Sequence, residues 1–98
     1  MDTKSVAETT KAIRNRVDRG MDLYRAGAVS RHGDALVVAG RARFYTVFVR
    51  DGEPRCDCLD FRERCRDAGH ACKHGYAAVA FEARERCGRS RGAKILRH

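Results

Sequence analysis

The chain has 98 residues, of which 43% are hydrophobic and 35% charged, and its 21 Lys and Arg against 13 Asp and Glu give a formal net charge of +8. A chain of this length makes one domain with a single small core, and no apolar run approaches the roughly 20 residues that a membrane-spanning helix needs. Most of the cations are Arg, whose planar fork suits phosphates and stacked bases, so nucleic acid is the leading charged partner. Solubility alone is the competing explanation of the charge.

The first ordered segment is predicted to be a helix within residues 1–27. Ser5 can cap its start while Glu8 reaches back to the cap amide, and Gly27 is a natural stop. An apolar stripe runs along it at mostly three- and four-residue steps, formed by Val6, Ile13, Val17, Met21, Tyr24 and Ala28. Gly20 costs about 1 kcal/mol relative to Ala inside a helix, so two shorter helices that break near Gly20 are the alternative. We favour one helix, because the stripe stays in phase across Gly20.

After the first helix the sequence changes to short β-prone runs separated by turn residues. A three-stranded antiparallel meander is predicted from the runs 28–31, 35–39 and 43–50. Asp51-Gly52 is typical of a tight turn, and Pro54 is expected to end the strand pairing. One face of this sheet is expected to pack on the first helix.

Three cysteines and one histidine form two tight pairs, Cys56-x-Cys58 and Cys72-x-His74, separated by thirteen residues. Ligands at i and i+2 of a strand end or tight turn can face one point, and two such pairs can close a tetrahedron of thiolates and imidazole around Zn²⁺. A disulfide between Cys56 and Cys58 would close too small a ring, and one between Cys58 and Cys72 would leave the other two residues unexplained. The pattern predicts one structural Zn²⁺ ion, with unrelated buried thiols as the alternative.

The insert between the two pairs adds further candidates. Cys65 and His70 can substitute as ligands, but neither forms an i, i+2 pair with another ligand type. Phe61 is expected to pack against the metal knuckle. Asp60 is expected to accept a hydrogen bond from the backbone or from the ligand histidine. Cys87, further along the chain, is expected to be a small apolar contact at a helix end.

From His74 the pattern is helical again, and Gly88 is expected to end this second helix. Residues 88–98 carry only basic charges and are predicted to be a disordered tail that either grips phosphates or is merely solvated. The predicted fold class is α+β: an N-terminal helix, a three-stranded antiparallel meander, a zinc knuckle and a C-terminal helix, in one compact domain.

The number of cysteines indicates which cellular compartment the protein occupies. Five cysteines are an odd number, and the N-terminus lacks the apolar and small-residue parts of a signal peptide. Both features favour a reducing compartment over a disulfide framework. We expect an intracellular protein, in the cytoplasm or, in a eukaryote, the nucleus.

The cysteine and histidine pattern resembles that of SWIM-type zinc fingers. The resemblance rests on the two ligand pairs, on Asp60-Phe61 after the first pair, on Lys73 inside the second, and on an upstream aromatic strand, and it covers residues 28–87. It implies a ββα-like module in which zinc joins a strand end to the start of a helix, with Cys56, Cys58, Cys72 and His74 as ligands. SWIM modules are associated with DNA binding and with protein–protein contacts.

Two functions of different kinds follow as hypotheses. The first is nucleic-acid binding, with DNA favoured, through Arg-rich surfaces whose candidate contacts are Arg14, Arg16, Arg19, Arg41, Arg43, Arg62, Arg64, Arg66 and Lys73. The second is an adaptor or regulator, in the manner of a small viral or host-regulatory factor, that docks on a larger protein. An enzyme is not expected, because three Cys and one His fill all four zinc positions and leave none for water.

Overall fold

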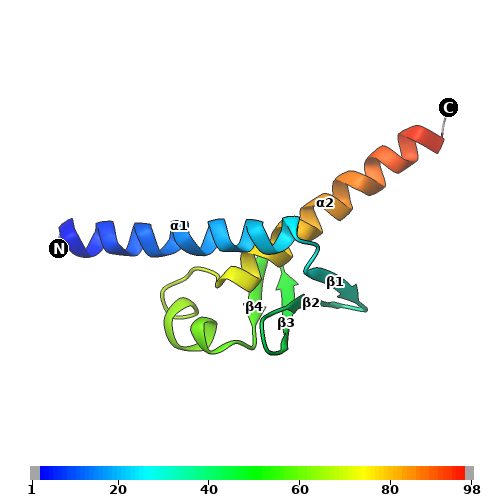
Figure 1. Ribbon diagram of the computed structural model, residues 1–98. Helices are drawn as coiled ribbons and strands as arrows, with labels where there is room; N and C mark the ends of the chain where they lie inside the picture. Colours follow the sequence, from blue (N-terminus) through cyan, green and yellow to red (C-terminus); the bar gives the residue numbers. More distant parts are fainter. Residues whose placement is uncertain (1–2, 97–98) are drawn as a thin grey trace.

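The computed structural model describes the backbone of residues 3–96 and the side chains of residues 10–88. The chain runs from a long helix, α1 (Thr3–Arg25), through the strands β1 (Val29–His32), β2 (Ala35–Ala39), β3 (Phe44–Arg50) and β4 (Glu53–Cys56). A short π-helix, η1 (Phe61–Cys65), then leads to a second long helix, α2 (Lys73–Leu96). Figure 1 shows the two helices crossing over one side of the sheet. The α+β class is confirmed.

Helix α1 is continuous through Gly20, so the alternative of two shorter helices is wrong. Gly20 is buried where α1 crosses α2, and a Cβ built there would lie 2.7 Å from the Cβ of Tyr76 and 2.8 Å from the carbonyl oxygen of Lys73. The glycine lets two helix backbones approach closely, which outweighs the weak helix propensity of Gly. The helix ends at Arg25, and Gly27 follows with a φ of 75°.

The sheet has four antiparallel strands in the order β1-β2-β3-β4, one more than the sequence predicted. The additional strand, β4, contains Pro54, which lies opposite Val49 of β3. Proline was expected to end the pairing, but β4 is an edge strand, where a missing backbone N–H is tolerated. The hairpin turn at Asp51-Gly52 is confirmed, and both residues have positive φ, 53° and 78°.

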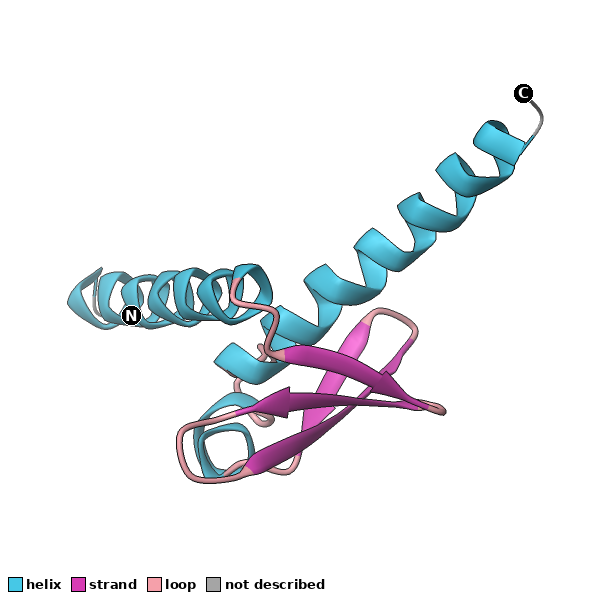
Figure 2. Ribbon diagram, turned by 45° about the vertical axis from the view of Figure 1, so that its right-hand side comes forward, coloured by secondary structure: helices cyan, strands magenta, loops and turns pink. Residues whose placement is uncertain are grey.

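Helix α2, rather than α1, covers the sheet. It contacts all four strands, whereas the extensive contacts of α1 are with α2. The expectation that the first helix packs directly on the sheet is therefore corrected to a three-layer order of α1, α2 and sheet, which Figure 2 shows from the side. The core lies between α2 and the sheet, and its most deeply buried large side chains are Leu36, Val38 and Val47.

Helix α2 continues past Gly88 to Leu96, where the sequence predicted a helix end and a disordered tail. A single glycine costs a helix about 1 kcal/mol and does not by itself end it, and residues around it include Arg, Ala and Lys, which are good helix formers. Residues 97 and 98 of the predicted tail lie outside the described chain. In the described part, neither long helix has an apolar stretch that could cross a membrane.

Candidate metal centre and basic surface

The two ligand pairs meet as predicted. Cys56 ends β4, Cys58 follows two residues later, Cys72 immediately precedes α2, and His74 is in its first turn. All four side chains are buried, and their donor atoms lie within 4.8 Å of one another. His74 presents Nδ1, which is 3.7 Å from the sulfur of Cys56 and 3.8 Å from that of Cys72. The cluster can hold a metal ion.

Backbone amides support two of the sulfurs. Phe61 donates its N–H to Cys58 Sγ, and Gly75 donates its N–H to Cys72 Sγ, both at 3.4 Å. Such bonds favour thiolates, which are the form that binds metal. The pKa of Cys58 is lowered, chiefly because Cys56 and then Cys72 hydrogen-bond to its sulfur, and that same bond to Cys58 raises the pKa of Cys56. A thiolate is therefore favoured at Cys58, and the neighbouring thiols of Cys56 and Cys72 stabilise it.

An aromatic stack that the sequence did not predict holds His74, the histidine of the cluster. The rings of Tyr45 and His74 lie 4.0 Å apart between centroids, at an interplanar angle of 22°. Arg43 lies on Tyr45 in turn, with its guanidinium carbon 4.9 Å from the ring centroid. The sequence feature that could have indicated this stack is the alternation along the strand, which places Tyr45 on the same face of β3 as the buried Val47. The stack restrains the orientation of the imidazole.

The residue between the first two ligands fastens the knuckle to the sheet. Asp57 donates its N–H to the carbonyl of Thr46 at 3.3 Å, and its carboxylate accepts the N–H of Thr46 at 3.1 Å. These bonds continue the β3–β4 ladder for one residue beyond Cys56. Arg43 also approaches the Asp57 carboxylate at 3.4 Å. The path of the chain between Cys56 and Cys58 is thus fixed by the strand beside it.

Asp60 has a different partner from the one expected. It accepts two hydrogen bonds of 2.9 Å from the guanidinium of Arg16 on α1, and none is seen from His74 within the described residues. The Arg16 hydrogen bond holds the pKa of Asp60 below its usual range and raises that of Arg16. Arg16, a predicted nucleic-acid contact, is instead committed to an ion pair that ties α1 to the segment after Cys58.

The remaining sulfur and imidazole groups lie outside the ligand cluster. Cys65 is fully buried, and its thiol donates to Asp60 Oδ2 at 3.6 Å. Phe61 is buried among the cysteines, as predicted. His70 is half-buried beside the carbonyl of Ala71. Cys87 was expected to be an apolar contact, but it is exposed, because it follows the part of α2 that covers the sheet.

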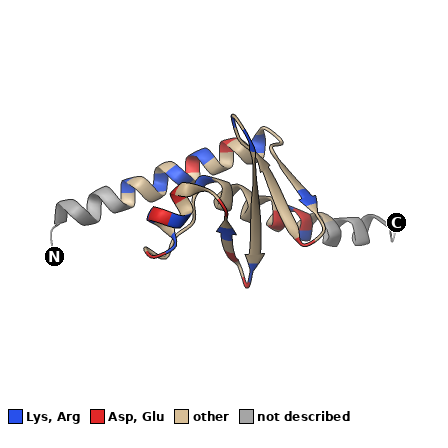
Figure 3. Cartoon of the chain, turned by 90° about the horizontal axis from the view of Figure 1, so that it is seen from below, with Lys and Arg blue, Asp and Glu red and all other residues tan. Residues whose placement is uncertain are grey.

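Four of the predicted nucleic-acid contacts lie together. A hollow of about 340 Å³, which we call the basic hollow, is lined by Ala12, Asn15, Arg16, Arg19, Asp60, Arg64 and Lys73. Its cations come from α1, η1 and the first residue of α2, which are three separate segments of the chain. Figure 3 shows the cationic positions recurring along α1. Lys73 lies between Cys72 and His74 in the sequence, so the cysteine–histidine cluster positions one wall of this hollow.

The other five predicted contacts are dispersed. Arg14 and Arg62 are exposed on α1 and η1 but do not line the basic hollow, and Arg66 lines a different hollow beside His70. Arg41 and Arg43 lie in the loop between β2 and β3, where Arg43 is engaged by Asp57 and Tyr45.

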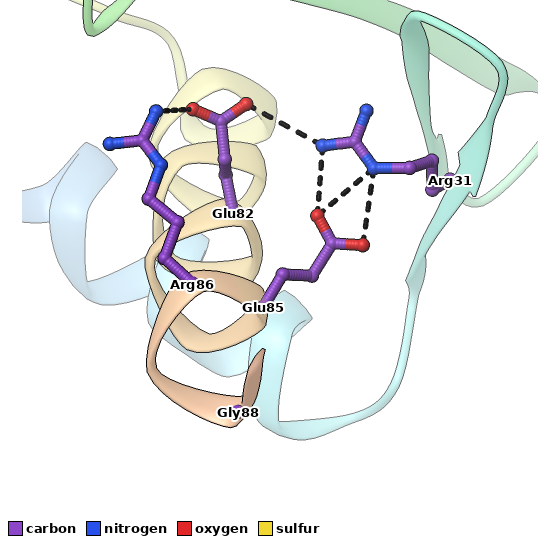
Figure 4. Close-up of a pocket in the computed structure, with 5 residues that line it drawn as sticks. All are labelled: Arg31, Glu82, Glu85, Arg86 and Gly88. Atoms are coloured by element: carbon purple, nitrogen blue, oxygen red, sulfur yellow. Dashed lines mark hydrogen bonds and ion pairs between the residues drawn. The ribbon is translucent and has the colours of Figure 1, made fainter. Parts of the chain in front are cut away.

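A larger hollow, of about 700 Å³, lies at the junction of β1 and α2. Figure 4 shows its charges paired with one another: Arg31 binds Glu85 at 2.8 Å and approaches Glu82 at 3.6 Å, while Arg86 binds Glu82 at 2.7 Å. These bonds fasten the outer strand to the helix. The hollow therefore offers a ligand little uncompensated charge.

Comparisons with protein-family models, with curated proteins and with solved structures find no match for this chain.

Proposed function

We propose that Cys56, Cys58, Cys72 and His74 hold one structural Zn²⁺ ion. Three thiolates and one imidazole are ligands that zinc prefers. Tetrahedral zinc, with bonds of about 2.3 Å to sulfur and about 2.0 to 2.1 Å to nitrogen, separates sulfur from nitrogen by about 3.5 to 3.6 Å. The distances from His74 Nδ1 to the sulfurs of Cys56 and Cys72, 3.7 and 3.8 Å, are within a few tenths of an ångström of that separation.

The proposed zinc has a structural rather than a catalytic role. All four coordination positions are taken by protein ligands, whereas a catalytic zinc keeps one position for water or substrate. In a small module this ion supplies folding energy, because the unfolded chain has no preformed site. The arrangement of a strand end, a knuckle and a helix start supports the SWIM-type assignment, in which zinc joins these elements.

We further propose that the protein binds nucleic acid, with DNA favoured, and that the basic hollow is its phosphate-binding site. The observation that carries this proposal is the convergence of Arg19, Arg64 and Lys73 on one hollow. No ion pair engages these three side chains within the described residues. Arg16 contributes by holding Asp60, the acid of the hollow, in an ion pair, so that three cations remain for phosphates.

The test is a titration of a labelled duplex with the zinc-loaded chain, followed by fluorescence anisotropy between about 50 and about 200 mM salt. The variant Arg19→Ala, Arg64→Ala, Lys73→Ala is compared with Arg25→Ala, Arg84→Ala, Arg86→Ala, which removes the same charge from exposed positions outside the hollow. Each lost phosphate contact is expected to lower the slope of log K against log salt by about 1. In the hollow variant, the magnitude of this slope should therefore fall by up to about 3. In the control variant it should fall much less.

Two results would overturn the proposal. One is the absence of binding at the lowest salt concentration. The other is equal weakening by both triple variants, since that would place the affinity in the overall charge and not in the hollow.

A further inference from the structure

The side of the sheet that faces away from the helices is uncovered in the described chain. Helices α1 and α2 both lie on the opposite side, as Figures 1 and 2 show. On β3, alternate residues point to opposite faces: Tyr45, Val47 and Val49 point toward the helices, and Phe44, Thr46, Phe48 and Arg50 point away. The uncovered side therefore carries two phenylalanines.

Both rings are accessible to solvent. Phe44 is 70% exposed and Phe48 is 42% exposed, and they are two of only three large hydrophobic residues that are exposed in the described chain. They are four residues apart on one strand, so their Cα atoms are separated by about 14 Å. That is too far for the rings to stack on each other, since stacked aromatic pairs have centroids about 4.5 to 7 Å apart. Each ring offers a face of its own.

The neighbouring side chains leave room above the rings and include two arginines. Directly opposite Phe44 on β2 is Ala39, and directly opposite Phe48 on β4 is Arg55. Phe48, Arg50 and Arg55 line a hollow of about 440 Å³ together with Asp51 and Glu53. Neither arginine is in an ion pair within the described residues, so both guanidinium groups are available to an anionic ligand.

We propose that this aromatic face, formed by Phe44, Phe48, Arg50 and Arg55, binds single-stranded nucleic acid. Unpaired bases stack on the two phenylalanine rings, and the arginines contact the phosphates between them. A duplex cannot use the rings in this way, because its bases are already stacked on one another. The inference rests on the proposed function and deepens it, since it assigns single strands to the aromatic face and leaves phosphates of any nucleic acid to the basic hollow.

Charge favours this ligand over an apolar protein surface or a second copy of the chain. An apolar partner covering Phe48 would remove Arg50, Arg55 and the acids beside them from water, which is costly for unpaired charges. A second copy of the chain carries the same net charge of +8, so the two copies repel each other. A nucleic acid has aromatic bases for the rings and negative phosphates for the arginines.

The experiment measures the affinity of the zinc-loaded full chain for two labelled probes by fluorescence anisotropy. One is a mixed-sequence single strand of about 16 nucleotides, near the upper site size of single-strand-binding modules, and the other is the matching duplex. The variant Phe44→Ala, Phe48→Ala is compared with Leu59→Ala, which removes a 63% exposed side chain outside the sheet. A second variant, Phe44→Trp, Phe48→Trp, keeps an aromatic surface at both positions.

We expect each lost ring to weaken single-strand binding about 5- to 150-fold, with the duplex affinity changed less than about twofold. The Trp variant and Leu59→Ala should bind both probes like the parent chain. The hollow variant Arg19→Ala, Arg64→Ala, Lys73→Ala should weaken both probes alike.

Suppose that the parent chain binds both probes, and that the Phe→Ala variant keeps its affinity for both or loses affinity for both equally. The aromatic face is then not a single-strand site, although the proposed function stands. If the parent chain binds neither probe at low salt, the proposed function fails together with the inference. A parent dimer in sedimentation that the Phe→Ala variant dissociates, with unchanged probe affinity, would assign the face to a second copy and overturn the inference.

Discussion

Gly20 on α1 and Tyr76 on α2 meet where the two helices cross, and a Cβ on Gly20 would lie 2.7 Å from the Cβ of Tyr76. The same position would be 2.8 Å from a backbone carbonyl and 3.1 Å from the backbone nitrogen of Ala77, neither of which can rotate away. The close approach sets how far α1 lies from the helix that carries Lys73 and His74. It therefore shapes the basic hollow as well as the packing of the two helices.

Gly20→Ala is predicted to destabilise the protein. In an open helix position the change would stabilise by about 1 kcal/mol, but overpacking a tight contact costs about 1 to 3 kcal/mol. We expect a net loss, measured as a lower midpoint in urea unfolding followed by circular dichroism with zinc present.

The matched control is Gly88→Ala on α2, where a Cβ would meet nothing within 4 Å. It is expected to stabilise the protein by about 0.5 to 1 kcal/mol. Equal midpoints for the two alanine variants would show that the helices can separate at the crossing without cost.

Arg16→Met is predicted to lower stability by about 1 kcal/mol, because the Asp60 carboxylate loses the two hydrogen bonds that Arg16 donates. The pair is partly exposed, with 15% and 37% of the two side chains accessible, which keeps the expected cost modest. Thermal unfolding should show the difference against Arg14→Met, an exposed position on the same helix that is expected to change stability by less than about 0.5 kcal/mol. Identical melting curves would mean that the ion pair contributes nothing.

The cluster of three cysteines and one histidine could be predicted from sequence because its information is local. Cys56 and Cys58, like Cys72 and His74, are two residues apart, and donor type with spacing suffices to define each pair. The strand β2 was predicted with its bounds for a similar reason, since a short apolar run stands between turn residues at Gly33 and Gly40.

The contacts that orient the site could not be predicted, because they join distant segments. Arg16 and Asp60 are 44 residues apart, and no pattern in either segment indicates the other. The stack of Tyr45 on His74 likewise depends on how α2 lies across β3. The prediction that Pro54 ends the strand pairing was wrong for a physical reason. A missing N–H excludes proline from a central strand but not from an edge strand, and which strand lies at the edge depends on the whole sheet.

Removal of the metal is predicted to unfold at least the segment from β4 into α2. Structural zinc contributes roughly 10 to 16 kcal/mol of apparent binding free energy, comparable with or larger than the whole stability of a small domain, about 5 to 15 kcal/mol. Cys72→Ala should therefore lose both the bound zinc, measured by native mass spectrometry, and much of the helical circular dichroism. Cys87→Ala, at an exposed position, should retain both.

Acid should reproduce the effect of ligand loss, since protons compete with the metal for the three sulfurs and for His74 Nδ1. As the pH falls, zinc release and loss of helical signal are expected to occur together. Retention of the folded signal by the zinc-free chain near neutral pH would contradict the structural role of the metal.

Cysteine alkylation should separate the five thiols by environment. In the zinc-loaded chain we expect one adduct with iodoacetamide near neutral pH, at Cys87, which is exposed. Cys65 is fully buried, and burial, with the nearby Asp60 charge, raises its pKa to about 12, so it stays protonated and unreactive. Intact-mass spectrometry should show no adduct for Cys87→Ser and five adducts for the parent chain after chelation in denaturant. Alkylation of Cys65 as fast as Cys87 in the folded chain would mean that the core beneath η1 opens readily, and that the Asp60–Arg16 pair does not hold it closed.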